Sequence, residues 1–128
     1  MQGTPQRDTR PELALRRRLH RLGLRFRVDA PLPETRRRAD VLFPRLRLAV
    51  FVDGCFWHGC PQHMTWPTNN ADWWRTKIEA TQRRDRDTDK LLAQSGWRIV
   101  RVWEHERTAE AAERVARAVN EQRSKLAV

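Results

Sequence analysis

The stretch ADVLFPRLRLAVFVDG, residues 39–54, decides the fold of this chain of 128 residues. Two apolar runs, 39–43 and 46–52, flank Pro44-Arg45, a pair that suits a tight turn. The second run is almost wholly apolar, which is typical of a central strand covered on both faces. The stretch therefore predicts a β-hairpin whose second strand lies inside a sheet.

A helix is predicted before this hairpin. Thr9-Arg10-Pro11-Glu12 is typical of a helix start, with Thr9 as N-cap and Glu12 reaching back to it. Gly23 indicates the end of the helix, and Arg16-Arg17-Arg18 is expected on its solvated side. Residues 24–38 contain two prolines and are expected to be irregular.

After the hairpin the pattern predicts a loop, a long helix over 71–94, a strand over 97–103 and an Ala-rich helix from residue 108 onward. The order helix, strand, strand, helix, strand, helix predicts a small mixed α/β fold, with one sheet flanked by helices. We expect a flexible lead over residues 1–8 and a single domain over 9–128.

Charge indicates the class of partner. Lysine and arginine total 26 against 16 aspartate and glutamate residues, a net charge of +10, which is typical of a protein that binds nucleic acid. No run of about 18 apolar residues is present to cross a membrane, and the first ten residues lack an apolar leader segment. We therefore expect a cytoplasmic protein without membrane contact, and a monomer.

The loop DGCFWHGCPQH, residues 53–63, carries candidate zinc ligands. Cys55, Cys60 and His63 are three soft or borderline ligands within nine positions. His105, just past the last predicted strand, is the best fourth ligand. The alternative is two free cysteines and ordinary histidines.

His58 and Asp85 form a candidate proton-transfer pair. His58 lies between the predicted zinc ligands and can face a substrate if those ligands turn toward the metal. Asp85 lies on the apolar face of the long helix, where an unpartnered carboxylate is costly. A hydrogen bond between the two would orient the imidazole for proton transfer. The alternatives are a surface histidine and a salt bridge from Asp85 to Arg83, Arg84 or Arg86.

Two aspartates mark the ends of the hairpin strands. Asp40 lies at the start of the first strand, shortly after Arg36-Arg37-Arg38, a setting that suits Mg²⁺ held near a phosphate. Asp53 closes the second strand, so pairing of the two strands can bring both acids to one side of the sheet. The alternatives are an ordinary hairpin opening for Asp40 and an Asp-Gly turn for Asp53.

Aromatic pairs are the last feature with a candidate function. Phe56-Trp57 lies in the polar loop, and Trp73-Trp74 lies near the start of the long helix. Exposed aromatic rings on a basic protein can stack on bases or wedge between base steps. The alternative is that these rings form part of the core.

Taken together, these residues resemble the very short patch repair (Vsr) DNA mismatch endonucleases. The main motif is VDGCFWHGCP-x-H at residues 52–63, and the resemblance spans roughly residues 7–106. Further matching segments, in order, are RDT-x-PE at 7–12, AD at 39–40, W-x-x-KI at 74–78, RD at 84–85, GWR at 96–98 and VWE at 102–104.

The resemblance implies a restriction-endonuclease-like fold with a structural zinc. It also implies Mg²⁺-dependent nicking of double-stranded DNA on the 5′ side of the thymine in a T·G mismatch, alongside possible mismatch-repair proteins at the nucleoid. Asp40 and the Val52 carbonyl match contacts to Mg²⁺. His58 matches the catalytic histidine, and Asp85 matches its carboxylate partner.

The same resemblance assigns the remaining site residues. Lys77 matches a residue that contacts the mismatched bases. The residues that fall where zinc ligands lie are Cys55, Cys60, His63 and His105, and those that match aromatics entering the duplex are Phe56, Trp57 and Trp74.

Three departures from the family pattern bear on the mechanism. A well-studied member has a histidine at the position of Asp53, paired with a glutamate that matches Glu12, whereas both are carboxylates here. We expect Glu12 and Asp53 to share a metal or a proton. We also expect a short N-terminal arm. Residues 39–60 contain no lysine, so histidine must do the work of a catalytic lysine.

Two other functions remain open from the sequence. One is a nuclease of the same fold with a different DNA target, and the other is a zinc-braced DNA-binding module without catalysis.

Overall fold

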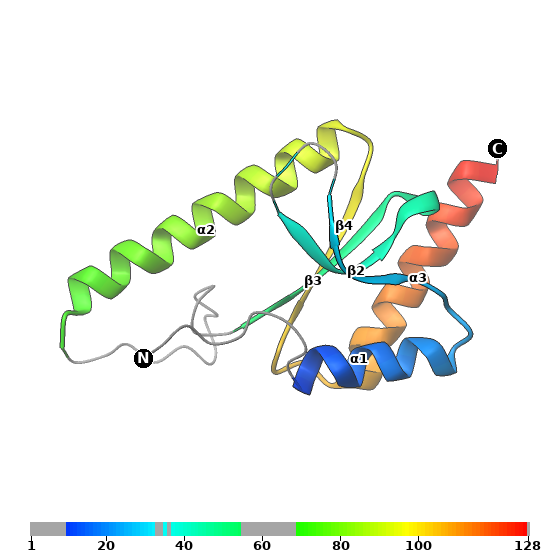
Figure 1. Cartoon of the computed structure of the whole chain (residues 1–128), viewed down its shortest axis with the longest axis horizontal. Helices are drawn as coiled ribbons and strands as arrows, with labels where there is room; N and C mark the ends of the chain where they lie inside the picture. The colour runs from blue at the N-terminus through cyan, green and yellow to red at the C-terminus, as the bar shows by residue number, and fades with distance from the viewer. Residues whose placement is uncertain (1–9, 33–34, 36, 55–68, 128) are drawn as a thin grey trace.

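The computed structural model describes residues 10–32, 35, 37–54 and 69–127. In chain order (Figure 1), its elements are the helix α1 (Arg10–Arg21), the strands β1 (Arg27–Pro31) and β2 (Arg38–Phe43), the short 3-10 helix η1 (Pro44–Leu46), the strand β3 (Leu48–Asp53), the long helix α2 (Ala71–Gln94), the strand β4 (Arg98–Trp103) and the helix α3 (Thr108–Ala127).

One mixed sheet holds the four strands in the order β1-β2-β3-β4. β1, β2 and β3 pair antiparallel, whereas β3 and β4 run parallel. The predicted hairpin is confirmed, with Val41 opposite Val50 and Phe43 opposite Leu48. Its connection is not the predicted tight turn at Pro44-Arg45 but the 3-10 helix η1 followed by Arg47, so β3 begins at Leu48 and not at residue 46. β3 lies inside the sheet, as its apolar sequence predicts. The small mixed α/β fold is therefore confirmed, including the bounds 71–94 of the long helix.

The expectation of irregular backbone over 24–38 is wrong for Arg27–Pro31, which form β1 at the edge of the sheet. Ala30 is the one buried residue of this strand. The sequence of the strand therefore lacks the alternation of apolar and polar residues that would have predicted it. Pro31 lacks an amide hydrogen, and the end of an edge strand tolerates that loss. The strand is held by pairing with β2, where Ala30 lies opposite Ala39.

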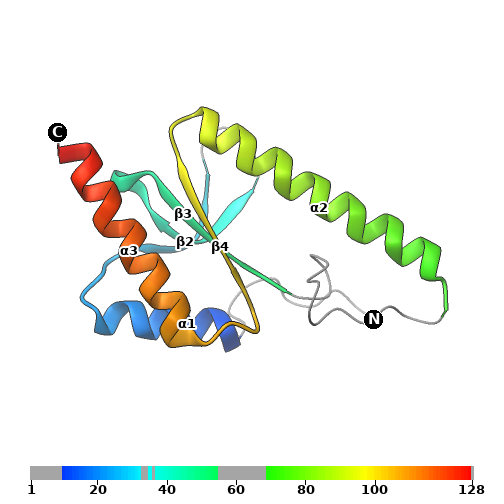
Figure 2. The same ribbon diagram turned by 180° about the vertical axis from the view of Figure 1, so that it is seen from behind.

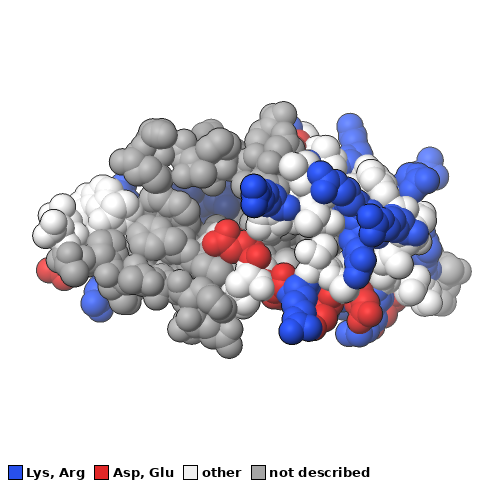
Figure 3. Space-filling view, turned by 90° about the horizontal axis from the view of Figure 1, so that it is seen from below, with Lys and Arg blue, Asp and Glu red and all other residues white. Residues whose placement is uncertain are grey.

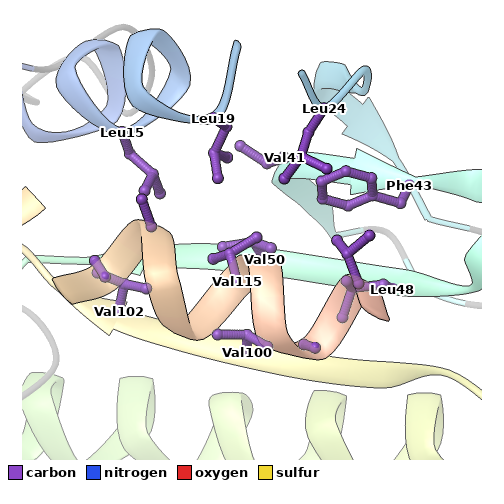
Figure 4. Close-up of a cluster of buried hydrophobic side chains, with 14 residues drawn as sticks. Leu15, Leu19, Leu24, Val41, Phe43, Leu48, Val50, Val100, Val102 and Val115 are labelled. Carbon is purple, nitrogen blue, oxygen red and sulfur yellow. The ribbon is translucent and has the colours of Figure 1, made fainter. Parts of the chain in front are cut away.

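Helices cover both faces of the sheet (Figures 1 and 2). On one face Leu15 and Leu19 of α1 and Val115 of α3 pack with Val50 and Val100 (Figure 4). On the other face the residues of β3 with the opposite parity, Ala49 and Phe51, pack with Leu92 of α2. The fold is thus a three-layer sandwich in which β3 is covered on both sides.

α1 ends at Arg21, just before the predicted stop at Gly23, whose φ of +83° falls in the region that glycine adopts easily. The expectation of a solvated Arg16 is wrong. Arg16 is buried and forms an ion pair of 3.3 Å with Glu12, one helical turn earlier on the same face. Arg17 and Arg18 are exposed, as expected. The start of α1 therefore brings a buried acid and a buried base to the sheet.

The strand directions place the site. β2 runs against β3, and β3 runs with β4, so the start of β2 and the ends of β3 and β4 lie at the same end of the sheet. Asp40, Asp53 and Glu104 come from these three strand ends. Among the described residues, no helix has the length and apolar character needed to span a bilayer.

Candidate active site

Asp40 lies near the start of β2 and reaches across to β3. Its Oδ2 accepts a hydrogen bond of 2.6 Å from the backbone amide of Val52. The structure therefore brings together Asp40 and Val52, the two residues that the sequence predicts for a magnesium site. The hydrogen bond fixes the orientation of the carboxyl group at the end of the sheet.

The pKa of Asp40 is raised from 3.8 to about 7. Burial is the largest cause, and repulsion by Glu12 and Asp53 adds to it, while the Val52 amide and Arg16 act in the opposite direction. Glu12 and Asp53 thus each lie close enough to Asp40 to disfavour its charged form, in keeping with the expectation that strand pairing brings both aspartates to one side. A buried group of acids of this kind favours a bound cation.

The donor atoms of this end of the sheet fit Mg²⁺ in type. Mg²⁺ prefers oxygen ligands, and in nuclease-like sites it uses one or two carboxylates, keeps several waters and takes further oxygens from phosphate. Asp40 offers a carboxylate and Val52 a backbone carbonyl. In the part of the chain that the structure describes, no group of three or more His, Cys, Asp or Glu side chains forms a complete metal site.

Asp53 ends β3 and is held by an arginine that the sequence analysis missed. Both of its carboxylate oxygens accept hydrogen bonds from Nη1 of Arg101, at 3.0 and 3.1 Å. Nε and Nη2 of the same guanidinium bind Asp89 of α2, at 2.9 and 2.7 Å. The guanidinium also lies 4.5 Å from the centre of the Phe51 ring. Arg101 is flanked on both sides by apolar residues of β4, and a cation in that setting was the sequence signal that could have indicated a buried ion pair.

Asp85 occupies the buried face of α2, as its position in the helical pattern predicts. Its Oδ1 lies 3.5 Å from Nη2 of Arg37 and 3.8 Å from Nη2 of Arg101. These two arginines come from other parts of the chain, so the helical pattern alone did not indicate them. His58 lies outside the described residues, and its predicted pairing with Asp85 stays a prediction.

Most of the predicted loop site also lies outside the described residues, namely Cys55, Phe56, Trp57, Cys60 and His63. Of the four candidate zinc ligands, the structure places His105. It is exposed just after β4, and its ring is stacked near that of Trp103, with centroids 6.4 Å apart. The zinc site therefore stays a prediction.

The start of α2 carries an exposed aromatic group beside a cation. Trp73 is 54% exposed, and the ammonium group of Lys77 lies 5.3 Å from the centre of its ring. Trp74 is half-buried and meets Trp73 edge-on, with centroids 4.7 Å apart. The family resemblance indicates Trp74 and Lys77, whereas the structure shows that Trp73 is the more accessible ring.

Figure 3 shows charge on the face that α1 borders. Acidic side chains lie in the middle of this view, and basic side chains gather to the right, on the side where Figure 1 places α1. The exposed arginines of α1 are Arg10, Arg17, Arg18 and Arg21. A long polyanion can therefore contact these basic side chains with one part of its length and approach the acidic side chains with another part.

Comparison with known proteins identifies the family of the chain. The family model described as "DNA mismatch endonuclease Vsr" matches residues 1–63. The type II nicking enzyme V.NaeI of Lentzea aerocolonigenes is 42% identical over 114 residues, which cover 87% of this chain and 69% of that protein.

Two further relatives are similar over most of the chain. The type II nicking enzyme V.XorIIP of Xanthomonas oryzae pv. oryzae is 44% identical over 108 residues, which cover 83% of this chain and 77% of that protein. The DNA mismatch endonuclease Vsr of Escherichia coli is 37% identical over 109 residues, which cover 81% of this chain and 66% of that protein. The chain therefore belongs to the Vsr family of DNA endonucleases.

Proposed function

We propose that this endonuclease uses Mg²⁺ to nick one strand of double-stranded DNA on the 5′ side of the thymine in a T·G mismatch. The observation that carries the proposal is the buried carboxyl group of Asp40, held by the Val52 amide beside Glu12 and Asp53. Family membership supports the same reading, since the matching model is described as a mismatch endonuclease.

Asp40 and the carbonyl of Val52 would hold the Mg²⁺ ion. When bound there, the ion would offset the negative charge of the phosphate and polarise a water molecule. The shared metal or proton expected for Glu12 and Asp53 stays a prediction. Because Arg101 binds both oxygens of Asp53, we infer that a shared metal is the better of these two alternatives.

We assign proton transfer to His58. Hydrolysis joins a water oxygen to phosphorus, breaks one phosphorus–oxygen bond and places a proton on the leaving oxygen. An imidazole can move that proton at neutral pH. Asp85 would accept a hydrogen bond from the other ring nitrogen of His58 and keep the ring oriented. The burial of Asp85 on α2 supports a fixed position for such a partner.

Mismatch selection would come from aromatic side chains and a lysine. A mismatched pair is cheaper to unstack than a matched pair, so rings that enter the duplex select it energetically. We assign this role to Phe56, Trp57 and Trp74, with Lys77 contacting the mismatched bases. The arginine-rich surface would add affinity that weakens with salt.

We further propose that the α/β fold is a restriction-endonuclease-like one, braced by zinc on Cys55, Cys60, His63 and His105. Residues 9–128 would act as one domain after a lead over 1–8. We expect the enzyme to work as a monomer in the cytoplasm, at the nucleoid, alongside mismatch-repair proteins.

A strand-specific nicking assay tests the proposed function. Two duplexes that differ only in a T·G or T·A pair are labelled on either strand and incubated with Mg²⁺ or with a chelator. We expect a nick 5′ to the thymine of the T·G duplex, dependent on Mg²⁺. Equal rates on the two duplexes would instead indicate a nuclease of the same fold with a different target. Binding without nicking would indicate a DNA-binding module.

A further inference from the structure

One guanidinium joins three carboxylates of the candidate site. Arg101 of β4 donates two hydrogen bonds to Asp53 of β3 and further ones to Asp89 of α2. Its Nη2 also lies 3.8 Å from Asp85 of α2. A single side chain therefore connects the end of the central strand with the helix that carries Asp85.

The charges around Arg101 make this connection strong. Asp53 and Asp85 are 6% and 8% exposed, so water screens their repulsion poorly. Burial opposes the charge of Arg101, but its hydrogen bonds to Asp89 and the attraction of all three acids outweigh that effect and raise its pKa. Among the described contacts, Arg101 is the cation that these three acids share. A neutral side chain in its place would remove the cation that α2 and β3 share, while Arg37 would still pair with Asp85.

The shape of the guanidinium matters as well as its charge. Arg101 lies directly opposite Phe51 in the β3–β4 pairing, and the ring flanks the guanidinium at 4.5 Å. A planar group with donors on several edges can bind Asp53 on one side and Asp89 on the other, which a lysine ammonium does less well.

We propose that Arg101 is a positioning residue for DNA nicking, because it sets the place of Asp85 relative to Asp40 and Asp53. This inference rests on the proposed function, in which Asp85 orients the catalytic histidine. In this role Arg101 acts through the carboxylates that it binds. Its loss therefore slows the chemical step and leaves DNA binding in place.

Single-turnover nicking by Arg101→Gln and Arg101→Lys tests the proposal. We expect Arg101→Gln to lower the nicking rate at least about tenfold, as is usual for residues that orient a catalytic group, with the DNA concentration at half-saturation unchanged within about threefold. The nicking rate of Arg101→Lys should fall between that of Arg101→Gln and that of the unmodified protein. The matched control is Arg98→Gln, on the same strand, where the arginine pairs with the exposed Glu121. We expect this control to stay within about twofold of the unmodified rate.

A double-mutant comparison separates positioning from a general effect on the fold. If Arg101 acts through Asp85, then Arg101→Gln should cost less than about threefold in an Asp85→Asn background. Full additivity of the two losses, or an unchanged rate in folded Arg101→Gln, would overturn the proposal. If Arg101→Gln does not fold, Arg101→Lys decides, since an unchanged nicking rate in that folded variant would overturn it.

Hydrogen exchange supplies a readout that does not need activity. We expect faster exchange over residues 84–92 of α2 in folded Arg101→Gln or Arg101→Lys, and no change there in Arg98→Gln. Unchanged exchange in the Arg101 variants would contradict the proposal. An unmodified protein that nicks neither duplex would contradict the proposed function alone, because the exchange comparison still reports on Arg101.

Discussion

The carboxyl group of Asp40 on β2 accepts a hydrogen bond of 2.6 Å from the amide of Val52 on β3. This contact ties the start of one strand to the end of its neighbour. It holds an acid in a buried position near Glu12 and Asp53, where its charged form is disfavoured. Shifted pKa values of this kind are common at functional sites, where the fold holds an ionisable group whose charged form is unfavourable without a ligand.

The metal-free protein should lose stability as pH rises through the titration of Asp40. The pKa of Asp40 is about 7 in the folded state and 3.8 ordinarily, so the folded state holds one more proton between these values. Raising the pH through this window therefore favours the unfolded state, by up to roughly 4 kcal/mol. Urea unfolding in a chelator at pH 5 and pH 8 measures the change.

Asp40→Asn isolates the effect of Asp40 ionisation on stability, because asparagine stays neutral and its side-chain oxygen can still accept a hydrogen bond from the Val52 amide. We expect the variant to be the more stable of the two at both pH values, and by a larger margin at pH 8 than at pH 5, because Asp40 of the unfolded unmodified protein is already mostly ionised at pH 5. A variant that is equally stable or less stable at pH 8 would contradict the raised pKa of Asp40.

Replacing Asp85 with asparagine should slow nicking about tenfold to a hundredfold, because the amide orients the histidine less well than a carboxylate. DNA affinity should change less than threefold, since Asp85 is buried on α2. Single-turnover rates and gel-shift titrations measure the two effects. Asp87→Asn is the matched control, an exposed acid two residues along the same helix. Equal rates for the two variants would exclude a role for Asp85.

The purified protein should contain one zinc ion per chain, held by the cysteine-rich loop. We expect Cys60→Ser to lose most of that zinc and to melt at a lower temperature, because a bound structural metal stabilises the folded state. Elemental analysis and thermal unfolding measure the two changes. A chain without zinc, whose two cysteines react freely with a thiol reagent under native conditions, would show that the loop has no such site.

Lys77 should contribute one cationic contact to DNA binding. Lys77→Gln is expected to weaken affinity for the T·G duplex and to reduce the slope of log affinity against log salt concentration by about 1. Lys90→Gln, an exposed lysine farther along α2, is the matched control. Fluorescence anisotropy over a salt series gives both slopes, and identical slopes for the two variants would remove Lys77 from the DNA interface.

Local sequence patterns predicted most of the fold. The apolar run of β3, the turn at Pro44 and the spacing of α2 are all signals within a few residues of one another. β1 was missed because Ala30 alone is buried in it, so its neighbours carry no pattern to detect. It forms through pairing with β2, which short-range patterns do not reveal.

The candidate site could likewise be predicted from the sequence only in part. Asp40 and Asp53 could be placed together because they lie at paired ends of one hairpin. Arg101 could not be assigned from sequence, since its partners Asp53 and Asp89 lie 48 and 12 residues away. The burial of Arg16 was missed because the sequence shows three equal arginines, and packing beside Glu12 selects one of them.

Nicking of the T·G duplex by Asp40→Asn, measured beside DNA binding, tests the central claim most directly. The variant keeps the shape of the side chain and an acceptor for the Val52 amide, but it loses the charge that would hold Mg²⁺. We predict at least about a hundredfold slower nicking, with binding of the same duplex within about threefold of the unmodified protein. Nicking by folded Asp40→Asn at the unmodified rate would contradict the claim that this end of the sheet is the active site.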